Sequence, residues 1–146
     1  MAPPFAADPP VKVNVPAKTL GLILAILGAI GALFGIFGVF ALLGLSAIAA
    51  AYGGIFLLAV IGVIIGEIGT VVGAWGGYQM YQEKREGKKL AIYGVLINVV
   101  GSLIAAIGGS GGLVGWIFGA LISFVIYYLI VISRFPGEPP LVATTA

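Results

Sequence analysis

The chain has 146 residues, of which 61% are hydrophobic and 8% are charged, and its formal net charge is +2. Soluble domains are roughly 45–50% apolar and about 25% charged, so this composition excludes a water-soluble globular protein and indicates an integral membrane protein. The absence of Cys and His excludes disulfides, Cys nucleophiles, the usual zinc sites and His-ligated haem.

Prolines divide the chain into three zones. Residues 1–18 hold five prolines and residues 135–146 hold three, whereas residues 19–134 hold none. Proline fixes φ and removes a hydrogen-bond donor. We therefore interpret 1–18 and 135–146 as Pro-containing extended tails, and 19–134 as a helical transmembrane domain.

Four apolar segments follow one another in the central zone. A spanning helix needs about 20 apolar residues, and we predict helices at about 20–45, 55–81, 90–108 and 113–133, arranged as two hairpins. Glycines around 44–54 and at 108–112 mark the turns within the hairpins. The first segment exceeds the ~7–15 apolar residues of a signal peptide, so we expect it to be a helix of the bundle.

All seven basic residues fall on one side of this topology. Lys84, Arg85, Lys88 and Lys89 form a basic loop between the second and third helices, and the other three basic residues lie in or beside the tails. By the positive-inside rule, we expect this loop and both termini to be cytoplasmic. The expected location is a prokaryotic inner or plasma membrane, crossed several times.

The 24 glycines fall in rows along the predicted helices. Spacings of three and four place small residues on one helix face, where another helix can approach closely. Such rows serve either packing within the bundle or association with a second copy or a partner. The glycines that we expect to pack helices are Gly31, Gly35, Gly62, Gly66, Gly69, Gly73, Gly77, Gly115 and Gly119. A bulky residue should therefore be more disruptive at Gly69 or Gly73 than at Gly21.

Glu67 is the one ionisable side chain at mid-membrane depth. A charge there is costly, so we expect Glu67 to face protein or water, or to be protonated. Asn98, Ser102 and Ser123 lie at comparable depth, and we expect an intramembrane polar cluster in which Glu67 bonds to Asn98 or Ser102. A structural clamp is one interpretation of this cluster. Ion or proton handling, and contact with a pigment, quinone or lipid, are the alternatives.

The sequence contains no P-loop, nucleophile elbow, zinc-protease motif or paired-acid site. We therefore expect no catalytic residues, no metal and no cofactor beyond lipid or pigment contacts, and no nucleic acid among its partners. Two function classes remain open. One is a non-catalytic accessory or scaffold subunit of a respiratory, photosynthetic or secretory membrane complex, packed through glycine-rich faces and extended tails. The other is a homo-oligomeric ion or proton channel, or a small transporter, that uses Glu67.

Overall fold

The computed structural model describes residues 3–6, 8–49, 51 and 53–139. Four α-helices follow one another in these ranges: α1 (Ala17–Ala49), α2 (Ile55–Tyr81), α3 (Glu86–Ile107) and α4 (Gly112–Ile132). Each is long and apolar enough to cross a membrane. The same residues form no strand, and the one β-type pairing among them is an isolated bridge between Pro16 and Arg134. The predicted all-helical, multi-pass membrane class is confirmed.

The helix ends agree with the predicted ones for α2 and differ most for α1 and α3. α1 begins at Ala17 rather than 20 and continues to Ala49 rather than 45. α3 begins at Glu86, inside the segment that we predicted to be a loop up to residue 89. Glu and Lys are good helix formers, so the fall in hydropathy across 86–89 does not coincide with the start of the helix.

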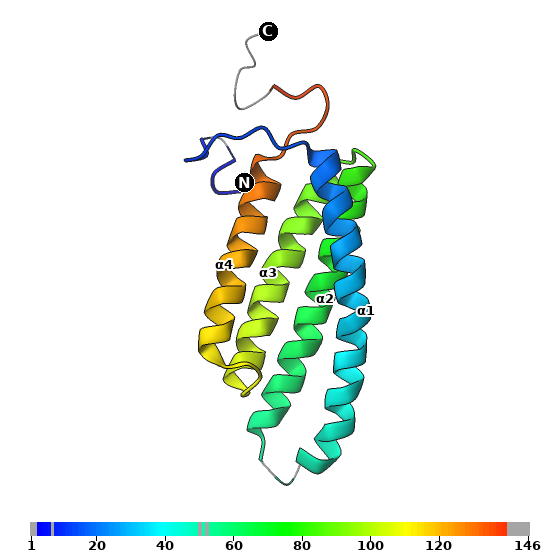
Figure 1. Cartoon of the computed structure of the whole chain (residues 1–146), viewed down its shortest axis with the longest axis vertical. Helices are drawn as coiled ribbons and strands as arrows, with labels where there is room; N and C mark the ends of the chain where they lie inside the picture. The colour runs from blue at the N-terminus through cyan, green and yellow to red at the C-terminus, as the bar shows by residue number, and fades with distance from the viewer. Residues whose placement is uncertain (1–2, 7, 50, 52, 140–146) are drawn as a thin grey trace.

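Consecutive helices run in opposite directions (Figure 1). The start of α1, the turn between α2 and α3, and the end of α4 therefore lie together at one end of the bundle, which we call the charged end. At 33 residues, α1 is roughly 50 Å long. Together with α2 it extends beyond α3 and α4 at the opposite end (Figure 1).

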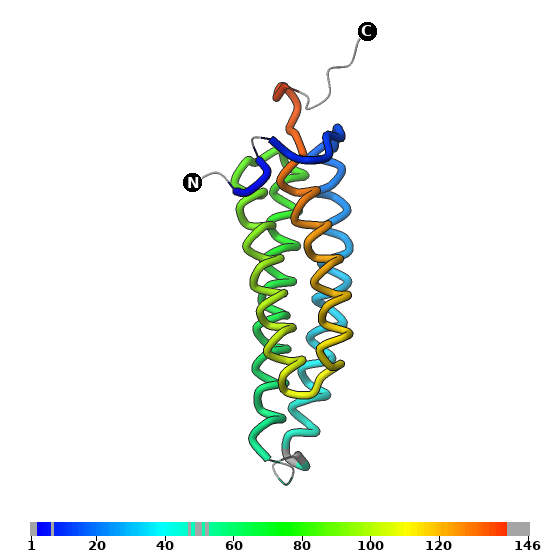
Figure 2. The backbone as a smooth tube through the Cα atoms, turned by 90° about the vertical axis from the view of Figure 1, so that its left-hand side faces the viewer, coloured from blue at the N-terminus to red at the C-terminus, as the bar shows by residue number. Residues whose placement is uncertain are grey.

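α2 and α3 form the closely packed centre of the bundle. α1 packs on α2 and α4 packs on α3, and both lie on the same side of the central pair (Figure 2). α1 and α4 hardly touch each other. The bundle is therefore uncovered along the side where these two outer helices face one another.

α3 ends at a glycine-rich turn that leads into α4. Gly109 adopts a φ of 93°, and the amide of Ser110 donates to the carbonyl of Ala105 over 2.9 Å. This left-handed residue and the bond across the last turn satisfy carbonyls that the helix end leaves free. A similar left-handed residue, Glu83 with a φ of 62°, follows α2.

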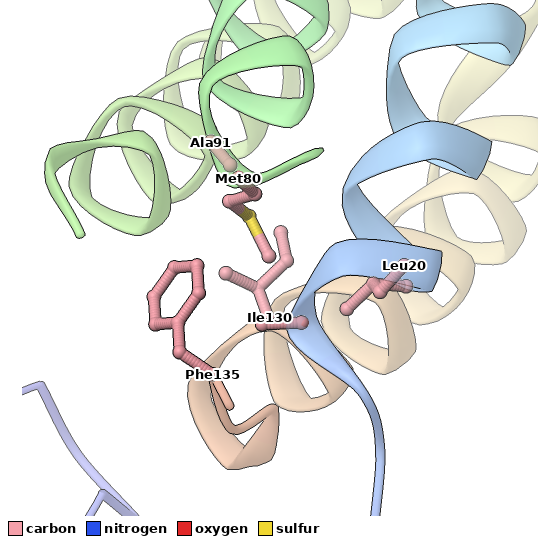
Figure 3. Close-up of a cluster of buried hydrophobic side chains, with 6 residues drawn as sticks. Leu20, Met80, Ala91, Ile130 and Phe135 are labelled. Carbon is pink, nitrogen blue, oxygen red and sulfur yellow. The ribbon is translucent and has the colours of Figure 1, made fainter. Parts of the chain in front are cut away.

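The ends of α1 and α4 are joined at the charged end by main-chain bonds. The amide of Arg134 donates to the carbonyl of Val15 over 2.9 Å, and the amide of Ala17 donates to the carbonyl of Arg134 over 2.8 Å. Beneath this tie lies a small buried apolar cluster (Figure 3), which consists of Ala17, Leu20, Met80, Ala91, Ile130 and Phe135. All four helices thus meet at the charged end.

The described part of the N-terminal tail lies against α4 of its own chain. The amide of Val11 donates to the Tyr128 hydroxyl over 2.9 Å, and that hydroxyl donates to the Val11 carbonyl. Phe5 meets Phe124 and Tyr128 edge-on, with ring centroids 6.5 and 6.2 Å away. Residues 140–146 of the predicted C-terminal tail lie outside the described residues.

Candidate functional site

The seam between α2 and α3 brings two backbones together at glycine. A Cβ added at Gly62 would lie 2.6 Å from the carbonyl oxygen of Gly101, and one at Gly69 would lie 2.8 Å from that of Gly94. Real Cβ atoms essentially never come so close to backbone atoms. Gly73 has more room, since its nearest atom would be the Cα of Gly94 at 3.7 Å. Gly66 is also in this seam, where an added Cβ would lie 3.9 Å from its nearest neighbours in Asn98 and Ser102.

The seam between α1 and α2 uses a second set of glycines. A Cβ at Gly77 would lie 2.8 Å from the amide of Ala25, so this member of the α2 row faces α1 rather than α3. A Cβ at Gly21 would lie 2.6 Å from the carbonyl of Gly77. Gly21 is therefore a packed position. The expectation that a bulky residue is more disruptive at Gly73 than at Gly21 is wrong, because the Cβ at Gly21 meets backbone at 2.6 Å and the Cβ at Gly73 meets nothing closer than 3.7 Å.

Two glycines of the predicted packing set face no neighbouring helix in the described part of the chain. A Cβ at Gly115 or Gly119 of α4 would meet no atom of the described chain within 4 Å. Both residues are exposed. Packing within the bundle therefore does not explain this pair, and a face for another helix is the alternative that stays open.

A polar clamp does join α2 and α3, and its centre is Asn98. The Asn98 amide nitrogen donates to the Gly66 carbonyl and to the Thr70 hydroxyl, each over 3.0 Å. Thr70 in turn donates to the Gly66 carbonyl over 3.1 Å. Thr70 is the partner that our sequence analysis missed. Its position one helical turn after Gly66 is the signal that could have identified it.

Glu67 lies outside this clamp, contrary to the expected bond with Asn98 or Ser102. The Asn98 amide is occupied by Gly66 and Thr70, and the Ser102 hydroxyl donates to Val99 of its own helix over 2.9 Å. Glu67 instead lies against Gly35 of α1, where an added Cβ would overlap the carboxylate. Its Oε1 atom is buried and has no hydrogen-bond partner among the residues that the structure describes.

An open cleft with a volume of about 240 Å³ lies between the four helices. Thr70, Asn98 and Ser123 supply the polar atoms of its wall, and apolar residues such as Leu27 and Ile126 supply most of the rest. The structure therefore places Asn98 and Ser123 around one space. Ser102 and Glu67, the other two members of the predicted polar cluster, are not part of its lining.

The four residues of the predicted basic loop do not all lie in one place. Lys84 lies in the turn, whereas Arg85, Lys88 and Lys89 line a pocket between the start of α3 and the end of α4. Lys88 donates to the carbonyls of Val131 and Ser133 over 3.1 and 2.6 Å. Lys88 thereby satisfies carbonyls at the end of α4, which the helix itself leaves free.

The Asn98 clamp predicts a measurable loss of stability. Replacing Asn98 by leucine removes the donor to both acceptors, and we expect unfolding in mixed micelles to become easier by about 1 kcal/mol, within the ~0.6–2 kcal/mol of membrane hydrogen bonds. Ser102→Ala is the control, because that hydroxyl bonds only within its own helix. Equal stability of Asn98→Leu and the wild type, measured by circular dichroism, would show that the clamp contributes nothing.

No protein-family model, no curated protein and no solved structure matches this chain. Within the described ranges, no three carboxylate side chains come together as a metal site would require. Function is therefore inferred from the contacts of Glu67, the uncovered helix faces and the charged end.

Proposed function

We propose that this protein is a small, non-catalytic subunit of a larger membrane assembly. The observation that carries the proposal is Glu67, whose buried Oε1 atom lies beside Gly35 without a partner in the described part of the chain. An unsatisfied polar group in hydrocarbon costs several kcal/mol. Glu67 as a whole is only half-buried, so a donor on a helix of another subunit would pair the carboxyl group from its exposed side.

A groove along α1 and α2 supports this placement of the partner. It has a volume of about 470 Å³ and its α1 wall includes three small residues, Ala25, Ala29 and Ala32. Small residues allow a neighbouring helix to approach closely. The groove also includes Val71, one turn along α2 from Glu67. A helix lying in this groove would therefore bring its side chains near the unpartnered carboxyl group.

The outer face of α4 is a second uncovered surface. Gly115 and Gly119 are four residues apart and meet no described atom, and Phe118 beside them is 65% exposed. Exposed apolar side chains suit lipid as well as protein, but small residues at this spacing favour contact with a helix. Together the two uncovered surfaces support a position between other helices, with the glycine-rich faces as packing surfaces.

A homo-oligomeric channel for protons or cations is the second candidate function. The same Glu67 oxygen favours it, because a carboxylate in an apolar segment can bind a proton or a cation. No other Asp or Glu lies between residues 20 and 81, or between 90 and 134. Proton paths usually chain several such groups, so the subunit proposal has the stronger support.

Substitutions at Glu67 separate the two functions. In the subunit proposal, Glu67→Gln keeps an oxygen acceptor and should retain the partner subunits, whereas Glu67→Leu should lose them. In a channel, the titratable group is required, so Glu67→Gln should abolish flux as completely as Glu67→Leu. The measurements are co-purification from native membranes in mild detergent and proton or cation flux in liposomes.

Glu86→Gln is the matched control, because it removes an exposed carboxylate at the charged end. It should change neither measurement. Foreign subunits that remain with wild type and Glu67→Gln but leave Glu67→Leu would support the proposal. A homo-oligomer whose flux disappears in Glu67→Gln would overturn it in favour of the channel.

A further inference from the structure

The charged end contains a pocket of about 500 Å³ between the start of α3 and the end of α4. Its lining combines cationic side chains with apolar ones and with two residues of the N-terminal tail. The lining residues are Pro3, Ala6, Arg85, Lys88, Lys89, Ile92, Tyr93, Val131 and Arg134. We call this pocket the basic pocket.

Positive charge in the basic pocket is only partly neutralised. Four of its side chains are cationic, and among the described residues the one carboxylate that pairs with them is Glu138, whose Oε1 lies 3.8 Å from the Nε of Arg85. The other ion pairs of the described chain, Lys12–Asp8 and Lys18–Glu83, use residues outside the pocket. The pocket therefore attracts an anion.

The basic pocket also holds hydrogen-bond donors without acceptors. The Nε atom of Arg134 is buried and has no partner in the described chain. Lys89 forms no ion pair or hydrogen bond with any described residue. Lys88 is held in place by the two carbonyls at the end of α4. An anion with several acceptor oxygens, such as a phosphate group, suits a pocket that is lined by two lysines and two arginines.

Apolar surface continues from the basic pocket along α3. Ile92, Tyr93 and Val131 belong to the lining. Further along the helix, Tyr93, Leu96 and Val100 are 47%, 49% and 53% exposed. A ligand with a charged head and hydrocarbon chains would use both surfaces, whereas a soluble anion would use only the cationic one.

We propose that the basic pocket binds the phosphate of an anionic phospholipid, whose acyl chains lie along the exposed face of α3. Phosphate is the chemistry that the cationic side chains recognise, and soluble phosphate esters share it. The apolar face of α3 favours the lipid. The site is independent of Glu67 and of any partner subunit.

The test is lipid binding by the full chain in mild detergent, measured by native mass spectrometry. The probes are phosphatidylglycerol, phosphatidylcholine and soluble glycerol 3-phosphate. The double variant Arg85→Gln/Lys89→Gln removes two cations of the pocket. Its matched control, Lys12→Gln/Lys84→Gln, removes two cations outside it, so the net charge falls equally. Lys89→Gln alone provides a milder variant, because this exposed side chain has no described partner to lose.

We expect the wild type to bind phosphatidylglycerol in preference to phosphatidylcholine. The double variant Arg85→Gln/Lys89→Gln should bind phosphatidylglycerol about 30-fold more weakly, because each cation near an anionic surface contributes about five-fold. The control pair should bind like the wild type, and Lys89→Gln should lie between. Equal weakening in the two double variants, or equal binding of phosphatidylcholine, would overturn the proposed site. Displacement of the lipid by an equal concentration of glycerol 3-phosphate would overturn the lipid as its ligand.

Discussion

Replacing Gly69 by alanine will destabilise the bundle, whereas the same replacement at Gly119 will stabilise it. At Gly69 the new methyl group would lie 2.8 Å from the carbonyl oxygen of Gly94 and 2.9 Å from the Cα of Asn98. Both atoms belong to backbone, which cannot move aside as a flexible side chain does. Overpacking of this kind costs about 1–3 kcal/mol. At Gly119 no described atom lies within 4 Å, so the helix gains about 0.5–1 kcal/mol from losing a flexible glycine.

Both variants add one methyl group to a helix. Opposite changes in stability would therefore reflect the different surroundings of the two positions. The measurement is unfolding in mixed micelles by a denaturing detergent, followed by circular dichroism. Gly73→Ala is an intermediate case, because its nearest neighbour would be at 3.7 Å. If Gly69→Ala stabilised the bundle, as Gly119→Ala is expected to do, the close contact of α2 with α3 would be refuted.

A membrane-impermeant thiol reagent will label cysteines at Val13 and Gln82 from one side of the membrane, and a cysteine at Ser110 from the other. All three positions are exposed, and Val13 and Gln82 lie at the charged end whereas Ser110 lies in the turn between α3 and α4. The chain has no Cys, so each variant carries a single thiol. By the positive-inside rule, we expect the charged end to face the cytoplasm.

Labelling is compared between right-side-out and inside-out vesicles. As a control, each variant is also labelled after the vesicles are permeabilised, which shows that its cysteine can react. We expect Val13→Cys and Gln82→Cys to react only in inside-out vesicles, and Ser110→Cys only in right-side-out ones. Labelling of all three from the same side would contradict the four-span topology. The reverse pattern would keep the four spans but place the charged end outside the cytoplasm.

The hydropathy of the chain and the glycines at its turns were sufficient to predict four helices. α2 could be delimited closely because Gly53 and Gly54 precede it and charged residues follow it. The start of α3 was missed because hydropathy reports the environment of a segment and not its backbone conformation. Glu86 and Lys88 lie in the helix although their sequence resembles a solvated loop.

The candidate site was predicted less well. A sequence gives the angles between side chains around one helix, but it does not say which helix packs against each face. Glu67 follows Gly66 directly in the sequence, so on a helix it points away from the face that carries Gly66 and Gly69. Since that face packs on α3, Glu67 faces α1. Gly115 and Gly119 have the same spacing as packed glycines such as Gly62 and Gly66, so spacing alone could not reveal that they are uncovered.

The main-chain tie between Val15, Ala17 and Arg134 makes the helical part of the polypeptide almost a closed ring. A short covalent link across this tie would complete the ring, and a cut at Gly111 in the turn between α3 and α4 would reopen it elsewhere. The resulting circular permutant would keep the same four helices and seams, with its new ends at the opposite end of the bundle. Because the tie uses main-chain atoms, it places little demand on the side chains at those positions. In this architecture, the order of the helices in the gene and their arrangement in the bundle would therefore be separable.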